Sequence, residues 1–324
     1  MEINNTARII VSRTDSIGDV ALTLPMCSWI KSKFPEVTLV FLCKRYTQEL
    51  VQCFKPVDEI LLLEDLEMYD QNTRNDKLRS DMILHVFPSK KIAGWAKQAG
   101  IEYRIATSHR WFHWFTCNIR ISFTRTNSPL HEAQLNFNLL KPLGLKTIPS
   151  FEEIKSVKYD VIIPSKPDFF SPGYVILHPL SQGSAINYPL KHYIALAEWF
   201  TRQGHHVLIT GTEKEGVQLG SAFDHISGVT NVCGKFSLGE LISLISKAKV
   251  LIACSTGPLH IAGMLDIRAI GLFSSRVPIH PGRWKSLGIQ AVALVKDPHC
   301  QRCAKGLDCL CITEIHVEDV VNAV

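Results

Sequence analysis

Two carboxylates stand in a short segment near the amino terminus, where they could do acid–base chemistry. Residues 13–20 read Arg-Thr-Asp-Ser-Ile-Gly-Asp-Val and follow an apolar run typical of a buried strand. Gly18 permits a tight strand-to-helix turn, which would place Asp19 beyond the end of that strand. A carboxylate in this position could accept a proton from an attacking hydroxyl group. The alternative is that Asp15 or Asp19 only caps a helix, which aspartate does well.

A second segment has the composition of a phosphate-binding helix start. Residues 254–262 read Cys-Ser-Thr-Gly-Pro-Leu-His-Ile-Ala directly after another strand-like run. The proline suits the first helical position, and three residues could serve as the cap: Ser255, Thr256 and Gly257. Free amides and the positive end of the helix dipole make such a terminus an anion site. His260 could reach the same ligand, or it could be a histidine packed within the helix.

A third polar segment, residues 178–189, also follows a strand-like run and ends at a proline that starts a helix. Its side chains Ser181, Gln182 and Ser184 could hydrogen-bond a phosphate or a sugar, although an ordinary surface loop would look similar. None of the three segments is a dinucleotide-binding Gly-x-Gly-x-x-Gly loop. The second also lacks the lysine and the glycines of a P-loop.

Four of the ten cysteines gather near the carboxyl terminus, at Cys300, Cys303, Cys309 and Cys311. Cys-x-x-Cys is a usual zinc half-site, whereas Cys-x-Cys is tighter than structural zinc sites generally use. A structural zinc site, a disulfide or redox pair, and plain thiols all remain open. The other six cysteines stand singly in apolar stretches, as small buried hydrophobic residues do in a reducing compartment.

The elements that must position these segments alternate between strand and helix. In the first half, the apolar runs predict strands at 7–12, 37–43, 59–63 and 82–86, and a helix at 91–100. In the second half they predict strands at 174–178, 207–210, 250–253 and 269–273, with helices at 192–203, 238–248 and 258–265. Such alternation implies parallel sheets covered on both faces. Ligands bind at the carboxyl ends of the strands in these folds.

The length of 324 residues favours two domains of ordinary size. Residues 147–172 contain four prolines and little periodicity, so they are interpreted as the interdomain connection, with a short edge strand at 157–163. We therefore predict an α/β protein with two Rossmann-like doubly wound domains, residues 1–165 and 166–324, that face each other across a cleft.

Charge and hydropathy argue against a nucleic-acid-binding protein and against a membrane-spanning one. The formal net charge is +5 and dispersed, without the dense basic patches of a nucleic-acid-binding protein. No apolar run approaches the roughly 20 residues that span a bilayer. The first five residues lack the pattern of a secretion signal, so a cytoplasmic location is expected. A mildly basic surface suits an anionic substrate or an anionic membrane surface.

Together these segments resemble glycosyltransferase family 9, the bacterial heptosyltransferase-like enzymes of lipopolysaccharide core synthesis, over nearly the whole chain. Residues 17–20 with Pro25 behind them resemble the amino-terminal signature of the family, and residues 255–260 resemble its carboxyl-terminal signature. His131 and the segment 210–215 also resemble family features. The resemblance implies a GT-B fold, an ADP-sugar or similar donor, inversion at the anomeric carbon, and no metal ion or other required cofactor.

The same resemblance assigns roles to individual residues. Asp19 would be the base that deprotonates the acceptor, and three residues would hold the donor diphosphate: Thr256, Gly257 and His260. Phe236 falls where the family places an apolar contact to the nucleotide base. Glu215 is the counterpart of an acidic donor-site residue. The amino-terminal domain would bind the acceptor and the carboxyl-terminal domain the nucleotide-sugar.

Two departures from the family pattern put the donor in question. Ile186 stands where many members carry a lysine, and Ser255 stands where heptosyltransferases usually carry an aspartate. A lost cation beside a diphosphate weakens stabilisation of the leaving group unless another cation replaces it. The candidates for that replacement are Lys191, Lys235, Arg276 and Arg283. The last two belong to a basic, aromatic segment, 276–284, which suits a phosphorylated sugar acceptor or is simply an ordered surface loop.

The sequence therefore predicts an inverting, metal-independent glycosyltransferase, with heptose from ADP-heptose as the leading donor. Its acceptor would be a lipopolysaccharide core or a similar lipid-linked glycan, met on the inner face of the inner membrane through peripheral contact. Two alternatives remain open at this point. One is a non-catalytic nucleotide-sugar-binding relative, and the other is a nucleotide-sugar epimerase of similar architecture.

Overall fold

The computed structural model describes residues 4, 6–126, 128–165, 170–307 and 309–324. The chain divides into two compact units, a first unit of residues 1–162 and a second unit of residues 163–324. Most of the amino-terminal segment considered for a secretion signal (1–3 and 5) and Pro167 of the proline-rich connection lie outside the described residues.

The first unit is built on a parallel six-stranded sheet with the strand order β3-β2-β1-β4-β5-β6. Its strands are β1 (Arg8–Ser12), β2 (Thr38–Cys43), β3 (Glu59–Leu62), β4 (Met82–His85), β5 (Tyr103–Thr107) and β6 (Ile119–Ile121). Ile9, Ile10 and Val11 of the central strand are completely buried. Continuous burial of this kind requires cover on both faces of the sheet.

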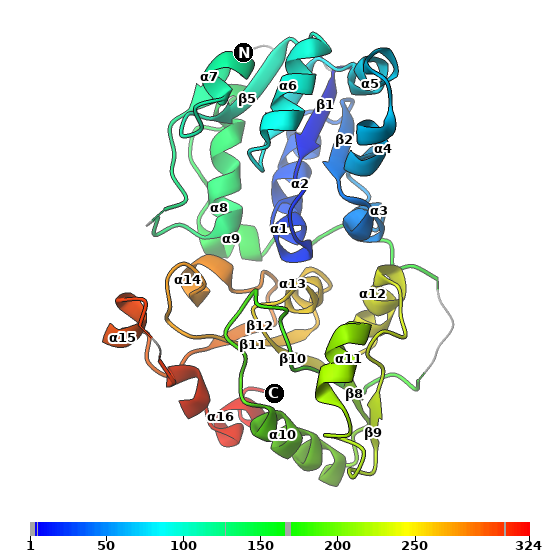
Figure 1. The fold of residues 1–324 in the computed structure, drawn as a ribbon, viewed down its shortest axis with the longest axis vertical. Helices are drawn as coiled ribbons and strands as arrows, with labels where there is room; N and C mark the ends of the chain where they lie inside the picture. Colours follow the sequence, from blue (N-terminus) through cyan, green and yellow to red (C-terminus); the bar gives the residue numbers. More distant parts are fainter. Residues whose placement is uncertain (1–3, 5, 127, 166–169, 308) are drawn as a thin grey trace. The chain divides into compact units, whose positions relative to one another are not determined.

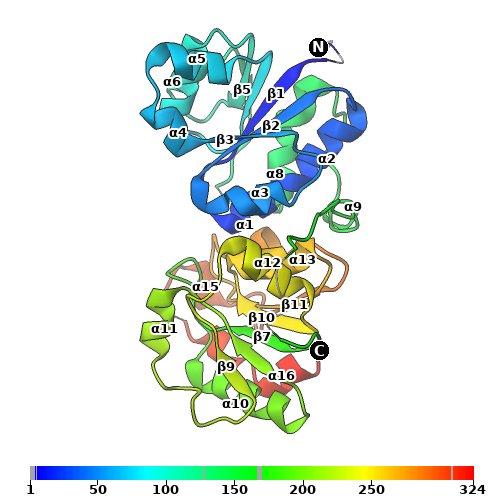
Figure 2. The same cartoon turned by 90° about the vertical axis from the view of Figure 1, so that its right-hand side faces the viewer.

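That cover comes from helices on the two sides of the first sheet. Figure 2 shows α4, α5 and α6 on one side of it and α2 and α8 on the other. The α-helices of this unit are α1 (Ile17–Ala21), α2 (Leu24–Lys33), α3 (Gln48–Gln52), α4 (Leu63–Met68), α5 (Gln71–Leu78), α6 (Lys90–Gln98), α7 (His113–Thr116), α8 (Glu132–Phe137) and α9 (Phe151–Lys155). Short 3₁₀ turns are η1 (Arg45–Thr47) and η2 (Asn138–Leu143).

The second unit repeats this plan with a parallel sheet of strand order β12-β11-β10-β7-β8-β9. Its strands are β7 (Val175–His178), β8 (Val207–Ile209), β9 (Val229–Asn231), β10 (Val250–Cys254), β11 (Arg268–Leu272) and β12 (Ala291–Leu294). Its helices are α10 (Leu190–Arg202), α11 (Glu213–Leu219), α12 (Leu238–Ser246), α13 (Gly257–Met264), α14 (Pro281–Trp284), α15 (Gln301–Ala304) and α16 (Val317–Val321), with the 3₁₀ turn η3 (Cys311–Glu314). The prediction of an α/β protein with two doubly wound domains is confirmed.

The carboxyl-terminal residues belong to the core of the second unit. Helix α16 packs beside α10, on the opposite side of the sheet from α12 and α13 (Figure 1). Ile312, Ile315 and Val320 are buried in the same apolar cluster as Val175 of β7 and Val250 of β10. The Arg268 side chain on β11 donates to the carbonyl oxygen of Ala323 at 2.9 Å. Residues 312–320 therefore form part of the apolar core of this unit.

The sequence predicts one strand that does not form, and it misses several strands at or near the edges of the sheets. The expected edge strand at 157–163 is not formed, and Val161 makes only an isolated bridge with Phe54. The contact is confined to one crossing point, where the Ile162 N–H donates to the Cys53 carbonyl oxygen at 2.7 Å. Four strands at or next to the sheet edges, β5, β6, β9 and β12, were not predicted. In β5, β6 and β9 charged or polar residues interrupt the apolar run, whereas β12 (Ala-Val-Ala-Leu) is a short apolar run that was not interpreted as a strand.

Among the residues that the structure describes, no helix is both long and apolar enough to cross a membrane. The longest helix, α10, has 13 residues and carries charged side chains along its length.

A close backbone approach fixes helix α13. A Cβ atom added at Gly263 would lie 1.8 Å from the Leu287 carbonyl oxygen and 2.1 Å from Ser286 Oγ. The loop Ser286–Leu287 therefore rests directly on the helix backbone. The helix cannot carry a side chain at this position without moving away from the loop.

We predict that Gly263→Ala lowers stability by about 3 kcal/mol or more, because overpacking against a backbone atom cannot be relieved by a rotamer change. The matched control is Gly94→Ala in helix α6, where nothing lies within 4 Å of an added Cβ. That substitution should stabilise the protein by about 0.5–1 kcal/mol through helix propensity. Thermal unfolding followed by circular dichroism measures both, and equal melting temperatures for the two variants would contradict the close approach.

Candidate functional site

Each sheet has one point at which the strand order reverses, and Asp19, Ser181, Ser184, Ser255 and Thr256 follow the strands beside these points. In the first unit the reversal lies between β1 and β4, and in the second between β7 and β10. Crossovers leave these points in opposite directions, which opens a crevice outside the carboxyl ends of the two strands. The segment after β1 carries Asp19, and the segments after β7 and β10 carry the hydroxyl and amide side chains singled out from the sequence.

Asp19 lies in the first turn of α1, where its carboxylate is held from two sides. Arg13 donates through a terminal nitrogen to Asp19 Oδ1, and the Ser16 hydroxyl donates to Oδ2. The Asp19 side chain is 15% exposed. The N-cap of this helix is Ser16, and no side-chain hydrogen bond caps it. Capping therefore does not describe the contacts that the Asp19 carboxylate makes among the described residues.

Gly18 departs from its predicted role. Helix α1 begins at Ile17, so Gly18 has helical backbone angles and is buried inside the first turn. The positive φ expected from a tight glycine turn is not needed, because the chain enters the helix directly from the extended Ser16. Asp19 nevertheless lies beyond the carboxyl end of β1, as predicted.

Arg13 links Asp19 to helix α8. Its side chain is 3% exposed and its Nε donates to Asp15 Oδ1 at 2.7 Å. A terminal nitrogen of the same guanidinium lies 3.2 Å from Glu132 Oε1 and 3.3 Å from Asn136 Oδ1. Glu132 and Asn136 are one helical turn apart, so both face the same way. Sequence reasoning named Arg13 in its motif without giving it a role, and it missed Glu132 and Asn136.

A second arginine closes this group, which we call the Arg13 network (Arg13, Asp15, Asp19, Arg125, Glu132 and Asn136). Arg125 Nε lies 2.9 Å from Glu132 Oε1, and another of its nitrogens lies 3.0 Å from Asn136 Oδ1. The Asn136 amide then donates to the Leu22 carbonyl oxygen at 3.2 Å. Helices α1, α2 and α8 are thereby tied to the end of β1 by side chains. His131 caps α8 through a reciprocal capping box with Gln134.

Burial and mutual charge shift the pKa values of residues in the Arg13 network. Desolvation raises the pKa of Asp15 to about 6, with a further upward contribution from the charge of Asp19 that Arg13 opposes. Desolvation acts to lower the pKa of Arg13, but the carboxylates of Asp19, Asp15 and Glu132 outweigh it and raise that pKa further. The guanidinium is therefore the fixed positive centre around which the three acids are arranged.

The helix start after β10 has the form that the sequence predicts, one residue out of register. Thr256 is the N-cap of α13, Gly257 is its first residue and Pro258 its second. The Thr256 side chain makes no cap hydrogen bond, and its buried Oγ1 has no hydrogen-bond partner in the described part of the chain. A buried hydroxyl normally has a partner, so this atom is available to a ligand at the helix start. His260 lies in the first turn and is 4% exposed.

The loop after β7 closes over this helix start. The Ser184 hydroxyl lies 2.8 Å from the Ser181 carbonyl oxygen and 3.3 Å from that of Ser255. The Ser181 hydroxyl lies 3.0 Å from the Ala185 carbonyl oxygen and 2.6 Å from Asn187 Oδ1, so it shapes the loop itself. Loop and helix start are therefore adjacent, as the neighbouring strands β7 and β10 require.

The segment after β8 joins the same group. The exposed Gln182 has a positive φ of 49°, and its amide donates to Thr212 Oγ1 at 3.0 Å. Glu215 Oε2 accepts from the Thr212 N–H at 2.8 Å and the Glu215 N–H donates to Thr212 Oγ1 at 3.3 Å, which together form a capping box for α11. Glu215 is 5% exposed. The acidic residue proposed for the donor site thus also holds a helix start.

His178, at the end of β7, is a neutral polar group in this setting. Its Nδ1 lies 3.0 Å from Thr210 Oγ1. Burial lowers the pKa of His178 to about 4, although the charge of Glu215 acts in the opposite direction. At neutral pH the imidazole therefore carries no charge and offers hydrogen bonds only.

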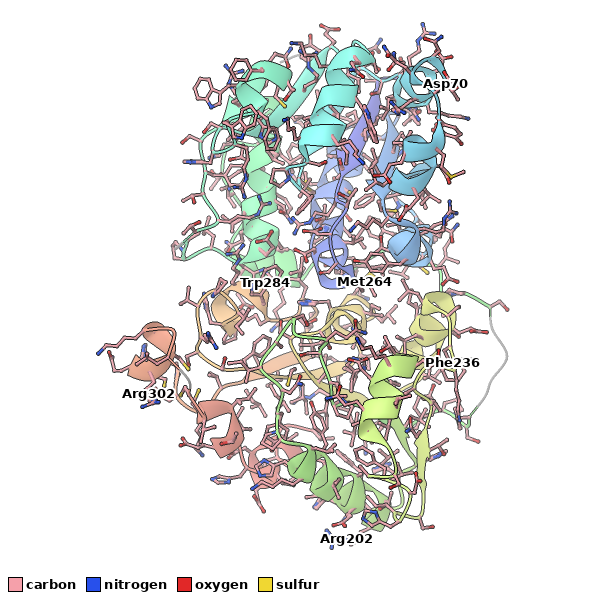
Figure 3. All side chains as sticks on the ribbon, in the orientation of Figure 1. Asp70, Arg202, Phe236, Met264, Trp284 and Arg302 are labelled. Carbon is pink, nitrogen blue, oxygen red and sulfur yellow. The ribbon has the colours of Figure 1, made fainter. Side chains whose placement is uncertain are left out.

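Phe236 and the four candidate cations occupy different parts of the second unit. Phe236 lies in the turn before α12, after the edge strand β9 (Figure 3). Lys235 precedes it, and Lys191 lies in the first turn of α10. Arg276 and Arg283 follow β11, which pairs directly with β10 (Figure 3 labels the adjacent Trp284). Ile186 is partly buried against the apolar core of the unit.

Comparison with known proteins identifies the family and the fold of this chain. The sequence model of glycosyltransferase family 9 (heptosyltransferase) matches residues 69–310. A Haemophilus influenzae protein to which glycosyltransferase activity is ascribed is 23% identical over 307 residues, 86% of each chain. The family 9 glycosyl transferase of Veillonella parvula superposes with a TM-score of 0.80 at 17% identity, covering 100% of this chain and 97% of that one. Escherichia coli ADP-heptose lipopolysaccharide heptosyltransferase II gives 0.75 at 16% identity, covering 98% and 97%.

Two doubly wound units, each with polar groups at its strand-order reversal, define the GT-B fold class. The chain belongs to glycosyltransferase family 9, and it is a glycosyltransferase of the heptosyltransferase-like kind.

The Arg13 network gives a testable pH dependence. We predict that Arg13→Met lowers stability by about 3–5 kcal/mol near pH 8, because it leaves buried carboxylates without their cation. The folded pKa of Asp15, about 6, lies above its ordinary value of 3.8, so the folded state binds more protons between these values. Stability from this group therefore rises as pH falls through 6, and the defect of the variant should shrink by pH 5.

Urea unfolding at pH 8 and pH 5 measures this effect. Arg8→Met is the matched control, since Arg8 forms a partly exposed pair with Glu59 at 2.7 Å. That control should lose about 1 kcal/mol or less. A defect of Arg13→Met that is as small as the control's, or that grows as pH falls, would contradict the network.

Proposed function

We propose that this glycosyltransferase moves a sugar, with heptose from ADP-heptose as the leading candidate, onto a hydroxyl of a lipopolysaccharide core or a similar glycolipid. Membership of family 9 supports the reaction class. The single observation that carries the proposal is the buried Thr256 hydroxyl at the start of α13, which has no partner among the described residues. A helix start of this kind binds the phosphates of a nucleotide-linked donor.

The two units divide the work in this proposal. Residues 166–324 bind the nucleotide-sugar donor, and residues 1–165 bind the acceptor and supply the base. The loops after β7, β8 and β10 support the first assignment, because they bring together several hydroxyl and amide groups around one helix start: Ser181, Gln182, Thr212, Ser255 and Thr256. The Arg13 network supports the second, because it holds a carboxylate at the end of β1.

Asp19 is the proposed general base. The acceptor hydroxyl would approach Oδ2, the oxygen that the exposed Ser16 hydroxyl contacts. As the acceptor oxygen forms its bond to the anomeric carbon, its proton passes to Asp19. The bond from that carbon to the diphosphate breaks on the opposite side, and the leaving diphosphate takes the electron pair. Attack opposite the leaving group inverts the anomeric configuration.

The donor diphosphate is the group that gains charge in this step. Thr256 Oγ1, the amide of Gly257 and the side chain of His260 are its proposed partners at the helix start. Fixed donors aimed at developing charge stabilise a transition state without reorganisation. Phe236 is the proposed contact for the nucleotide base. Glu215 is the proposed acidic group of the donor site, with one carboxylate oxygen engaged by Thr212.

Arg276 is the best-placed replacement for the missing lysine. It follows β11, which pairs with β10, and it lies near the start of the segment that leaves the same end of the sheet as Ser255. Lys235 instead follows the edge strand β9, three strand positions away from β10. Ile186 packs against the apolar core, so the residue that occupies the lysine position here serves packing.

The proposed reaction needs no metal ion, because protein groups supply both the base and the stabilisation of the leaving group. The enzyme would act at the cytoplasmic face of the inner membrane, where a lipid-linked acceptor is presented.

The roles of the two units predict that separate substitutions remove catalysis and weaken donor binding. Asp19→Asn should lower kcat for sugar transfer about 10²–10⁴-fold, because the base is lost, and leave ADP binding intact. Thr256→Val should weaken ADP and ADP-heptose binding about five- to tenfold, by one lost hydrogen bond. Stability should be unchanged by Thr256→Val, since the hydroxyl has no partner among the described residues. Transfer assays and ligand-induced thermal shifts, each with and without brief EDTA treatment, measure these effects.

Two matched controls accompany these variants. Asp76→Asn changes an exposed carboxylate on α5 and should leave transfer unchanged. Thr47→Val removes a buried hydroxyl that lies 3.0 Å from the Lys44 carbonyl oxygen, so it should lower stability without changing ADP affinity. Full transfer by Asp19→Asn would remove Asp19 from the mechanism. Loss of activity in EDTA that added Mg²⁺ restores would overturn the metal-independent route.

A further inference from the structure

The cysteines near the carboxyl terminus form a group that sugar transfer does not use. The Sγ atoms of Cys300, Cys303, Cys309 and Cys311 all lie within 4.8 Å of one another. Two sulfur pairs, Cys300–Cys309 and Cys303–Cys311, are each 3.3 Å apart. A disulfide bond would need about 2.05 Å. Four sulfurs around a tetrahedral ion with bonds of about 2.3 Å lie about 3.8 Å apart, which this group accommodates.

The chain brings the four sulfurs together from two short segments. Cys300 and Cys303 lie at the start of α15 and within it, whereas Cys309 and Cys311 precede and begin η3. Three of the four residues are buried and Cys309 is half-buried. In the part of the chain that the structure describes, this is the group of side chains whose geometry could hold a metal ion. Four thiolates in tetrahedral array select zinc or iron.

Backbone amides point at these sulfurs. The Cys311 N–H lies 3.4 Å from Cys309 Sγ, and the Ser275 N–H donates to Cys311 Sγ. N–H groups around a thiolate stabilise its negative charge, and such outer contacts orient metal ligands.

We propose that these four cysteines bind one tetrahedral divalent metal ion, zinc or ferrous iron, as a structural site. The thiols lose four protons to solvent when the ion binds, and the ion changes neither its charge nor its oxidation state. The site joins α15 to η3, whose Ile312 lies in the core of the second unit. Through Ser275, whose hydroxyl also contacts the Asp297 carbonyl oxygen, it fixes the segment after β11.

Elemental analysis of the full-length protein, purified with a thiol reductant, tests the proposal. We expect about one zinc or iron ion per chain, and loss of most of it in Cys303→Ser. The control Cys53→Ser should retain the metal, because Cys53 lies in the first unit and its thiol donates to the Glu49 carbonyl oxygen, as a serine hydroxyl can. The identity of the bound ion shows whether the site holds zinc or iron.

Two further measurements decide the matter if Cys303→Ser does not fold. Titration of the wild-type protein in denaturant should find ten free thiols. Cobalt added to the metal-stripped, reduced protein should give the visible spectrum of a tetrahedral tetrathiolate. Four missing thiols would show two disulfides and overturn the site. A fully reduced protein that binds neither zinc, iron nor cobalt would overturn it as well.

A second, independent feature is a group of exposed aromatic side chains at α7. Trp111, Trp114 and Phe115 are 65%, 59% and 70% exposed within five consecutive residues. We call them the α7 aromatic surface. Large aromatic rings exposed together on a soluble domain mark an interaction site. Helix α7 lies at the edge of the first unit, beside α6.

Basic groups are interleaved with these rings. Lys90 Nζ lies 5.0 Å from the centre of the Trp111 ring, and the Arg120 guanidinium carbon lies 4.7 Å from that of Trp114. No aspartate or glutamate occurs in the sequence between Glu102 and Glu132. Aromatic rings favour the membrane–water interface, and lysine and arginine are attracted to anionic headgroups. This pairing of chemistries fits a lipid surface.

We propose that the α7 aromatic surface docks on a membrane that contains anionic phospholipid. The proposal rests on the proposed function in one respect, since a lipid-linked acceptor requires the enzyme to meet a membrane. Sedimentation with vesicles of phosphatidylethanolamine and phosphatidylglycerol should capture the full chain, and vesicles of phosphatidylcholine should capture much less of it. Replacing all three aromatic residues by alanine should reduce capture about tenfold or more.

The matched control replaces Met68 and Val217, which are 84% and 80% exposed, by alanine and should leave capture unchanged. The triple variant should also keep its ADP-induced thermal shift and its activity on a water-soluble acceptor fragment. That second assay separates a failed membrane proposal from a failed function. Equal capture by both vesicle types, or capture that survives the triple replacement, would overturn the lipid surface.

Discussion

The rule that βαβ crossovers are right-handed constrains this molecule more than any single contact does. A sheet that grows outward from a central strand in both directions must reverse its order once, and each unit here does so beside its first strand. At that point neighbouring helices leave on opposite faces, so loops at the strand ends are not covered by a crossover. Asp19 and Thr256, which belong to different motifs, both lie beside such a reversal.

Within the first unit, the Arg13 network holds a reactive carboxylate in place at a cost in desolvation free energy. Burial desolvates the acids around the Arg13 guanidinium, and the raised pKa of Asp15 expresses that desolvation cost. What the arrangement provides is orientation: each oxygen of Asp19 has a defined partner, and helix α8 is tied to the turn that carries it. In the second unit, capping residues such as Thr212 and Glu215 set the loop geometry at a smaller desolvation cost.

Much of the fold could be predicted from the sequence, because buried parallel strands are continuous apolar runs and the central strands are the most apolar. The short outer strands could not, since β6 and β9 are only half-buried and mix charged or polar residues with apolar ones. Local motifs placed Asp19 and Thr256 correctly on their elements. Contacts between residues far apart in the sequence could not be predicted, because nothing near Arg13 indicates that Glu132, 119 residues further on, is its partner. Glu215 could have been interpreted better, since Thr-x-x-Glu is itself a capping-box pattern.

The return of α16 to the core of the second unit has a consequence for synthesis of the protein. All strands of the first sheet lie within the first 121 residues, so that unit can fold while translation continues. The second unit cannot complete its apolar core until Ile315 and Val320 have been made, because they pack against β7 and β10. The nascent chain therefore carries a finished domain followed by an open sheet with exposed apolar residues. During that interval the second unit is the part most in need of a chaperone.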